Sequence, residues 1–353
     1  MFSSIKIQRF RGLENLEISG LSRVNLLLGK NNAGKTSVLE AFFLLCGATN
    51  PSMPNTVSFL RGQRIANVLP DNVWRCLFYG MNPNSSIHIE GRWQNEGRCR
   101  MLDIKARMAA TNDALESGVG TASCDEELTI DSLRLSYTDA KDREVVTQAK
   151  FDREHGQLEM VPMERDDFVR CTFLSARSYS TMERDARQFS HLVRIKQDRE
   201  VVESLKIIEP RVCGIEVLSE YGGSSVYVDL GLPSLIPLAA CGEGFVRFFS
   251  IIVEVTNSRQ GLLLIDEIDN GLHYSVMQNL WTLLGQMCID HNVQIVATTH
   301  NDELVMSAVD SFASHPDDFR VFRVDRTTQG HRSVRYDEED LSAVRETQFE
   351  IRG

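Results

Sequence analysis

The sequence predicts an α/β fold that combines a parallel central sheet with an antiparallel β-rich lobe. From residue 242 onward, short apolar segments alternate with amphipathic helical ones, which is typical of parallel strands joined by covering helices. Between 86 and 163, short alternating segments are separated by turn signals, which favours antiparallel strands. A third pattern, Gly-x-x-x-x-Gly-Lys-Thr at 29–36, lies between an apolar segment and a helical one and indicates where the chemistry takes place.

The N-terminal residues predict three strands followed by a helix. Residues 4–10 alternate apolar and polar side chains, as in a strand with one buried face. Leu16–Ile18 are expected to complete a hairpin after Gly12, and the continuous apolar run Val24–Leu28 predicts a buried strand. Residues 37–46 have a helical pattern.

An inserted lobe is expected after residues 50–56, where two prolines break the helix. Two short helices, at 57–67 and 71–79, and a polar loop at 110–125 are predicted. Strands of the lobe are expected at 86–93, 98–107, 127–137, 143–151 and 157–163. We therefore divide the chain into a discontinuous head, 1–50 and 166–353, and an inserted β-rich lobe, 51–165.

The second half of the chain predicts the parallel sheet. Residues 168–176 have the pattern of a buried strand, 181–208 that of two helices ended by Pro210, and 212–218 with 226–230 that of a strand pair. The elements that follow alternate in type, with helices at 243–257, 272–290 and 301–314 and strands at 261–265, 293–298 and 319–324.

The composition excludes several classes of protein. The 353 residues are 42% hydrophobic and 25% charged, which fits a globular protein rather than a disordered chain. No apolar run approaches the roughly 20 residues that span a bilayer, and the first residues lack the pattern of a secretion signal. None of the eight Cys stands at CxxC spacing, so we expect free thiols in a reducing cytoplasm. The net charge of −11 argues against a surface that binds nucleic acid indiscriminately, but it is compatible with a local basic groove.

Residues 29–36 have the spacing of a phosphate-binding loop. Two glycines permit a conformation in which successive backbone N–H groups converge on phosphate oxygens, and the next helix adds the partial positive charge of its N-terminus. Lys35 carries an ammonium to the β- and γ-phosphates, and the Thr36 hydroxyl is a suitable Mg²⁺ ligand. The flanking strand and helix disfavour the alternative, a chance match in a Gly-rich turn. The residues expected to bind the nucleotide are Gly29, Lys30, Asn31, Asn32, Ala33, Gly34, Lys35, Thr36 and Ser37.

Two later strands end in polar residues that complete the predicted site. Residues 261–269 are predicted to form an apolar strand that ends in carboxylates. Asp266 is suited to bind Mg²⁺, and Glu267 can polarise the attacking water. Acids placed for a helix dipole are the alternative, which the loop upstream disfavours. His300 follows the strand 293–298 at the same sheet edge, where it can sense the γ-phosphate or orient the water. We therefore predict Lys35, Glu267 and His300 as catalytic residues and Thr36 and Asp266 as Mg²⁺ ligands.

With these motifs in order, the chain resembles the ABC-type ATPases of the RecF, SMC and OLD group, particularly the single-chain AAA family ATPases of bacteria. The segments that carry the resemblance are 5–13, 25–41, 265–273 and 298–301, with weaker matches at 173–177 and 242–247. The resemblance covers about 1–50 and 168–353 and implies a P-loop NTPase with an ABC-type head. It further implies the bacterial type without the TOPRIM nuclease domain of the larger OLD proteins.

The resemblance also implies how nucleotide is bound. Such ATPases hold ATP between two heads, so that each nucleotide touches the phosphate loop of one subunit and the signature segment of the other. Lys35, Thr36, Asp266, Glu267 and His300 inherit their roles at the matching positions. Residues 269–273 lie where the D-loop is expected, at the contact between the two heads.

The signature segment departs from the family pattern. ABC heads show Leu-Ser-Gly-Gly-Glu, whereas residues 238–244 read Leu-Ala-Ala-Cys-Gly-Glu-Gly, without the serine that would donate to the γ-phosphate of the other head. The backbone N–H groups of Gly242 and Gly244 are expected to meet that phosphate instead. An ordinary Gly-rich helix start is the alternative. The Q-loop glutamine is not located, and Gln63 is a candidate.

We expect an ATPase that uses ATP and Mg²⁺ and forms homo-oligomers through its heads. Its expected role is that of a sensor or scaffold in bacterial anti-phage defence or genome maintenance, with a separate effector such as a nuclease or toxin and with no membrane association. The alternative is a stand-alone RecF-like DNA-repair ATPase that binds DNA directly. A transporter subunit is disfavoured by the missing signature motif and the large insertion. No N-K-x-D motif for guanine occurs, although a GTP preference stays open.

Three further features have less specific interpretations. Residues 165–206 contain nine Lys or Arg against seven acids, which indicates either a basic stripe for nucleic acid or, as we favour, a solvated face of mixed charge. Arg177 can reach a nucleotide phosphate. Residues 337–340 are expected to begin a C-terminal helix.

Overall fold

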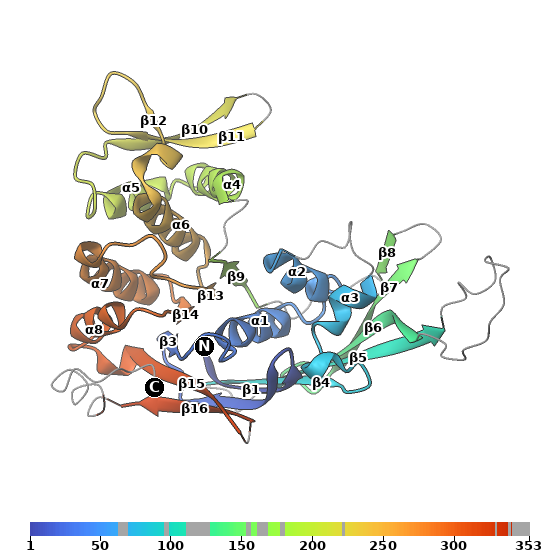
Figure 1. Ribbon diagram of the computed structural model, residues 1–353. Helices are drawn as coiled ribbons and strands as arrows, with labels where there is room; N and C mark the ends of the chain where they lie inside the picture. The colour runs from blue at the N-terminus through green and yellow to red at the C-terminus, as the bar shows by residue number, and fades with distance from the viewer. Residues whose placement is uncertain are drawn as a thin grey trace.

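The computed structural model describes residues 1–62, 70–94, 99–110, 128–152, 157–160, 169–176, 181–220, 223–328, 330–337 and 340. The described strands form two large sheets and one small sheet. Helix α1 (Lys35–Cys46) contacts strands of both large sheets and lies between them (Figure 1). None of the described helices is long and apolar enough to cross a membrane.

The central sheet has the strand order β16-β15-β3-β14-β13-β9. Its neighbouring strands are parallel except for the edge strand β16, which is antiparallel to β15. Every residue of β3, β13 and β14 is buried, as expected for parallel strands covered on both faces. The strands are β3 (Val24–Leu28), β9 (Cys171–Leu174), β13 (Leu262–Ile265), β14 (Gln294–Thr298), β15 (Phe319–Thr327) and β16 (Gly330–Tyr336).

Helices cover the two faces of the central sheet unequally. One face packs against α6 (Glu243–Asn257), α7 (Tyr274–Asp290) and α8 (Asp302–Ser311), which stack along one side of the molecule (Figure 1). The other face packs against α1. The alternation of helices and strands predicted for this half of the chain is confirmed, with boundaries that differ by a few residues.

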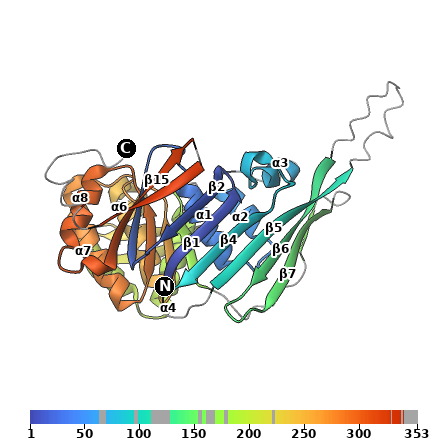
Figure 2. The same cartoon turned by 90° about the horizontal axis from the view of Figure 1, so that it is seen from below.

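The second large sheet is antiparallel and has the order β2-β1-β4-β5-β6-β7-β8. One face packs against α1, α2 (Met53–Leu60) and α3 (Pro70–Arg75), and the other face carries no described helix (Figures 1 and 2). The strands predicted between 86 and 163 are confirmed. The strands are β1 (Phe2–Phe10), β2 (Leu13–Ser19), β4 (Ile87–Trp93), β5 (Cys99–Ala110), β6 (Leu128–Thr138), β7 (Glu144–Asp152) and β8 (Gln157–Met160).

The antiparallel sheet differs from the expected lobe at its N-terminal boundary. The predicted division places residues 2–19 in the head, whereas β1 and β2 are two of the seven strands of this sheet. Ile7 of β1 is opposite Leu16 of β2 on one side and Ile89 of β4 on the other. The buried face of β1 therefore joins a core that continues into the segment after residue 50. The expected boundary at 165 and 166 lies outside the described residues.

The two short helices also differ from the prediction. Where helices at 57–67 and 71–79 are predicted, the structure has α2 at Met53–Leu60 and α3 at Pro70–Arg75, and residues 63–67 lie outside the described residues. The sequence predicts that Pro54 interrupts helical structure, but Pro54 stands in the first turn of α2, where its missing N–H has no helical partner to lose. Gln63, Arg177, residues 111–125 of the predicted loop and most of 337–353 lie outside the described residues, whereas Ala110 ends β5.

A small third sheet completes the described chain. It has the order β10-β11-β12, formed by β10 (Gly214–Glu220), β11 (Gly223–Asp229) and β12 (Ile236–Pro237). It packs with α4 (Thr181–Arg194) and α5 (Asp198–Leu205), so the two predicted helices and the strand pair are confirmed. Arg184 of α4 pairs with the buried carboxylate of Glu254 at 2.7 Å, so part of the positive charge of residues 165–206 faces the interior.

One buried side chain connects the two large sheets. Gln294, at the start of β14, is 1% exposed. Its Oε1 accepts a hydrogen bond from the N–H of Phe2 at 2.8 Å, and its Nε2 donates to the carbonyl oxygens of Phe2 at 2.9 Å and Ser22 at 2.7 Å. The first residue of β1 is thereby held against the central sheet.

We expect Gln294→Ala to lower the free energy of unfolding by about 2–3 kcal/mol, because the N–H and carbonyl groups of Phe2 lose the Gln294 side chain, while the Ser22 carbonyl oxygen keeps the Asn25 amide as a donor. Urea denaturation measures this change. Gln286→Ala, an exposed site on α7, is the matched control and should change stability by less than about 0.5 kcal/mol. Equal effects of the two substitutions would contradict the role of Gln294.

Candidate functional site

The loop between β3 and α1 has a backbone that glycine alone accommodates at its first position. Gly29 has a φ of 136°, and a Cβ at this residue would lie 2.3 Å from the carbonyl oxygen of Val324 in β15. The loop therefore packs directly on the neighbouring strand. α1 begins at Lys35, with its N-terminus directed at the loop.

The ammonium group of Lys35 is held inside this loop. The side chain is buried, and Nζ donates to the carbonyl oxygens of Gly29 at 2.7 Å and Lys30 at 3.1 Å. Burial lowers the pKa of Lys35 to about 8, and the nearby carboxylates of Asp266, Glu267 and Asp269 limit the fall. A positive charge with little hydration is thus available to an anionic ligand in the loop.

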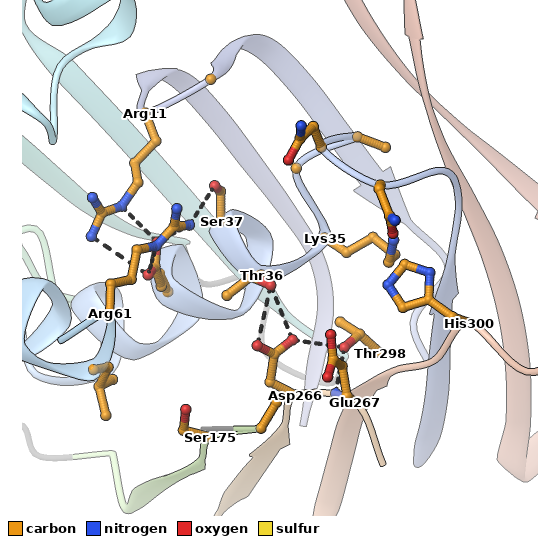
Figure 3. A pocket seen from close by; sticks show the side chains of 18 of the residues that line it. Arg11, Lys35, Thr36, Ser37, Arg61, Ser175, Asp266, Glu267, Thr298 and His300 are labelled. Carbon is orange, nitrogen blue, oxygen red and sulfur yellow. Dashed lines mark hydrogen bonds and ion pairs between the residues drawn. The ribbon is translucent and has the colours of Figure 1, made fainter. Parts of the chain in front are cut away.

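The carboxylate of Asp266 meets the start of α1 although the two are far apart in sequence. The Thr36 hydroxyl donates to the Asp266 carboxylate oxygens at 3.0 and 3.2 Å, across a separation of 230 residues (Figure 3). The Thr298 hydroxyl donates to Asp266 Oδ1 at 2.8 Å and accepts from the N–H of Glu267 at 2.8 Å. The ends of β3, β13 and β14 therefore converge on one point.

These residues line a cavity of about 960 Å³ (Figure 3). Of the residues predicted from sequence, those that line it are Asn31, Asn32, Ala33, Gly34, Lys35, Thr36, Ser37, Asp266, Glu267 and His300. Gly29 and Lys30 do not line the cavity but hold Lys35 through their carbonyl oxygens. Gly242 and Gly244 are not brought to it.

Three arginines that the sequence did not indicate, Arg11, Arg61 and Arg326, also line the cavity. Arg11 and Arg61 both bind the fully buried carboxylate of Glu40 on α1, at 2.7 and 2.6 Å. Arg61 also donates to the Ser37 hydroxyl at 3.1 Å. Burial lowers the pKa of Arg11, and Glu40 opposes this effect. Arg11 belongs to the segment 5–13 that carries the family resemblance, whereas Arg61 lies in no motif.

A further arginine supports the acidic strand end from behind. Arg247 of α6 is buried, and its guanidinium donates to the carbonyl oxygens of Ser175 at 3.1 Å, Asp266 at 2.7 Å and Glu267 at 3.1 Å. It therefore links the ends of β9 and β13. The sequence feature that could have indicated Arg247 is its position in segment 242–247, which matches the family weakly.

The segment expected to carry the signature lies at the start of α6. Leu238–Cys241 form a 3₁₀ turn, and the helix begins at Glu243. A Cβ at Gly244 would lie 2.6 Å from the carbonyl oxygen of Gly271, so this glycine permits close packing on the segment 269–273. The two segments expected at a contact between heads are therefore neighbours, and both lie outside the cavity.

The donor atoms of the site suit a nucleotide with a hard divalent cation. Thr36 and Asp266 provide oxygen ligands of the kind that Mg²⁺ prefers, and this ion commonly takes its remaining ligands from water and phosphate. The described residues contain no group of three or more His, Cys, Asp or Glu that could enclose a metal ion by themselves. Lys35, the loop N–H groups and the arginines supply positive charge for a phosphate chain.

Comparison with solved structures identifies the fold as that of an SMC head. The structure titled "Crystal structure of the SmcHead bound to the C-winged helix domain of ScpA" superposes with a TM-score of 0.53, covering 97% of this chain and 99% of that one at 11% identity. This agreement confirms the predicted α/β head with parallel and antiparallel sheets.

Comparison with protein families identifies the class of the chain. The chain belongs to the family described as an AAA domain, putative AbiEii toxin, type IV TA system, whose model matches residues 131–307. A model described as an AAA ATPase domain matches residues 1–151. The predicted recognition as an AAA family ATPase is therefore confirmed.

Two curated proteins are similar over most of their length. An "ATP/GTP phosphatase" of Helicobacter pylori is 22% identical over 334 residues, covering 86% of each chain. The "Septu protein PtuA" of Bacillus thuringiensis is 23% identical over 318 residues, covering 87% of this chain and 74% of that protein. Together with the family models, these similarities define the chain as an AAA-type ATPase.

Burial of Lys35 predicts how stability depends on pH. The pKa of this lysine is about 8 in the folded protein against an ordinary 10.5, so between these values the unfolded chain binds more protons and stability rises with pH. Relative to Lys35→Met, the wild type should gain about 2 kcal/mol of unfolding free energy between about pH 7.5 and 9.5. Urea denaturation at both pH values measures the difference.

The exposed Lys105→Met serves as the control, which should leave the pH dependence of the wild type unchanged. A stability difference between wild type and Lys35→Met that stays constant with pH would contradict the burial of the ammonium.

Proposed function

We propose that the protein binds Mg–ATP in this cavity and hydrolyses it by in-line attack of water on the γ-phosphate. The observation that carries the proposal is the meeting of Lys35 and Thr36 of the loop with Asp266 and Glu267, which come from a strand end some 230 residues later. Sequence motifs that are separate in the chain form one pocket, and the AAA ATPase family models support the assignment.

Each residue has a proposed role in this reaction. Backbone N–H groups of residues 29–37 hold the phosphates, and Lys35 stabilises their charge. Thr36 and Asp266 hold Mg²⁺, which neutralises charge on the β- and γ-phosphates when bound. Glu267 positions the attacking water as general base, and His300, which lines the same cavity, contacts the γ-phosphate.

A second head is part of the proposal. Gly242 and Gly244 lie outside their own cavity, at the N-terminus of α6, where backbone N–H groups suit an anion. This position supports a homodimer in which the α6 terminus of one head faces the nucleotide of the other. Ala239, Ala240 and Cys241 stand where a signature serine would be expected, so the contact would rest on backbone groups.

The cellular role that we propose is that of a sensor or scaffold in bacterial anti-phage defence or genome maintenance, working in the cytoplasm with a separate effector such as a nuclease or toxin. Two similarities support the defence setting. The family description names a putative toxin of a type IV TA system, and the Septu protein PtuA is similar over most of its length.

Glu267→Gln should lower the rate of phosphate release by at least about 100-fold, because the water loses its general base. Binding of a fluorescent ATP analogue should be unchanged. Glu203→Gln, an exposed acid on α5, is the matched control and should release phosphate like the wild type. Wild-type turnover by Glu267→Gln with ATP still bound would show that the assignment is wrong.

Glu267→Gln should also form a stable dimer when ATP and Mg²⁺ are present, because slow hydrolysis preserves the nucleotide between the heads. Analytical ultracentrifugation measures the change from monomer to dimer. Lys35→Ala, which lacks the charge for phosphate, should not dimerise under the same conditions. An unchanged sedimentation coefficient of Glu267→Gln would contradict the proposed arrangement.

Purification from the native operon tests the cellular role. A stoichiometric protein partner supports the effector proposal, whereas purification without protein or nucleic acid counts against it. A salt-dependent, ATP-sensitive mobility shift with duplex DNA would favour the alternative, an ATPase that acts on DNA directly.

A further inference from the structure

The hydroxyl of Thr298 lies between the two acids of the site. Thr298 is the last residue of β14 and is 1% exposed. Its Oγ1 donates to Asp266 Oδ1 at 2.8 Å and accepts from the backbone N–H of Glu267 at 2.8 Å (Figure 3). A hydroxyl has one proton to donate, so the bond to Asp266 uses it, and the bond from Glu267 uses an acceptor position. Both bonds require the same orientation of the threonine side chain.

The backbone of Glu267 depends on this contact. Glu267 has a φ of 49°, in the left-handed region that side chains other than glycine rarely adopt. Such a conformation persists when surrounding groups hold it on several sides. Thr298 holds the N–H of Glu267 through its hydroxyl and the N–H of Ile268, at 2.9 Å, through its carbonyl oxygen.

The carboxylate of Asp266 depends on the same contact. Asp266 Oδ1 accepts from Thr298 at 2.8 Å and from Thr36 at 3.0 Å, so hydroxyls on two sides fix its plane. Among the described residues, loss of the Thr298 hydroxyl would leave Thr36 as the remaining hydrogen-bond donor to the carboxylate. The hydrogen bond between Thr36 and Asp266 would change when the Thr36 hydroxyl binds a cation.

We propose that Thr298 is a positioning residue for both acids, orienting the Asp266 carboxylate toward Thr36 and fixing the direction in which the Glu267 side chain leaves the strand end. The proposal rests on the nucleotide site described above. It assigns to one hydroxyl the coupling of the Mg²⁺-binding acid and the water-positioning acid, a role that none of the sequence motifs indicated.

Three variants test the proposal. Thr298→Val keeps the shape of the side chain and removes the hydroxyl, Thr298→Ser keeps the hydroxyl, and Thr256→Val removes a buried hydroxyl of α6 that bonds only the Ile252 carbonyl oxygen at 2.9 Å. We expect Thr298→Val to lower kcat about 10- to 100-fold, as for other groups that orient metal-binding side chains. Thr298→Ser and Thr256→Val should stay within about threefold of wild type.

A binding measurement separates positioning from general damage. In a titration with a fluorescent ATP analogue, Thr298→Val should raise the Mg²⁺ concentration for half-maximal binding about tenfold, with affinity in EDTA unchanged. Thermal unfolding checks that Thr298→Val and Thr256→Val lose similar stability. Should Thr298→Val fail to fold, Thr298→Ala takes its place in the same comparison.

The proposal is overturned if Thr298→Val has wild-type kcat and Mg²⁺ dependence, or if Thr298→Ser is as impaired as Thr298→Val. A wild-type protein that binds nucleotide with Mg²⁺ but releases no phosphate would contradict the proposed hydrolysis instead. In that event the Mg²⁺ titration still decides whether Thr298 orients Asp266.

Discussion

The order of three parallel strands is the constraint on which the rest of the site depends. β14 lies between β3 and β13, and all three run in the same direction. Their carboxyl ends therefore meet at one edge of the sheet, where open α/β sheets commonly bind ligands. The loop after β3, the acids after β13 and Thr298 at the end of β14 come together for this reason alone.

Helix α1 connects the site to the second large sheet. Its first turn carries Lys35 and Thr36, and its body packs against both large sheets. Glu40 on the same helix binds Arg11 from the β1–β2 turn and Arg61 from the end of α2. The antiparallel sheet and its covering helix α2 thus contribute two cations to a cavity that is also lined by α1 and by the strand ends of the central sheet.

Most of the buried charged side chains around the site are hydrogen-bonded or paired with an opposite charge. Lys35 is desolvated but bonded to two carbonyl oxygens, Glu40 is fully buried between two guanidiniums, and Arg247 is buried against three carbonyl oxygens. Burying charges in this way is unfavourable unless they are paired and hydrogen-bonded. The site therefore holds its charged groups in fixed directions before any ligand arrives, which is the condition for electrostatic stabilisation of a phosphate transfer.

Local patterns of residues were enough to predict the features that depend on neighbours in the chain. A glycine-rich turn between an apolar strand and a helix, and the alternation of strands with helices after residue 242, are encoded in neighbouring residues. Lys35, Asp266, Glu267 and His300 could be assigned to one site from their motifs, whereas the presence of Arg11, Arg61 and Thr298 in the same cavity is known only from the structure. Arg61, Thr298 and the membership of β1 in the antiparallel sheet follow from strand order and long-range packing. The pattern of a single segment cannot predict these features, because each depends on a partner tens to hundreds of residues away.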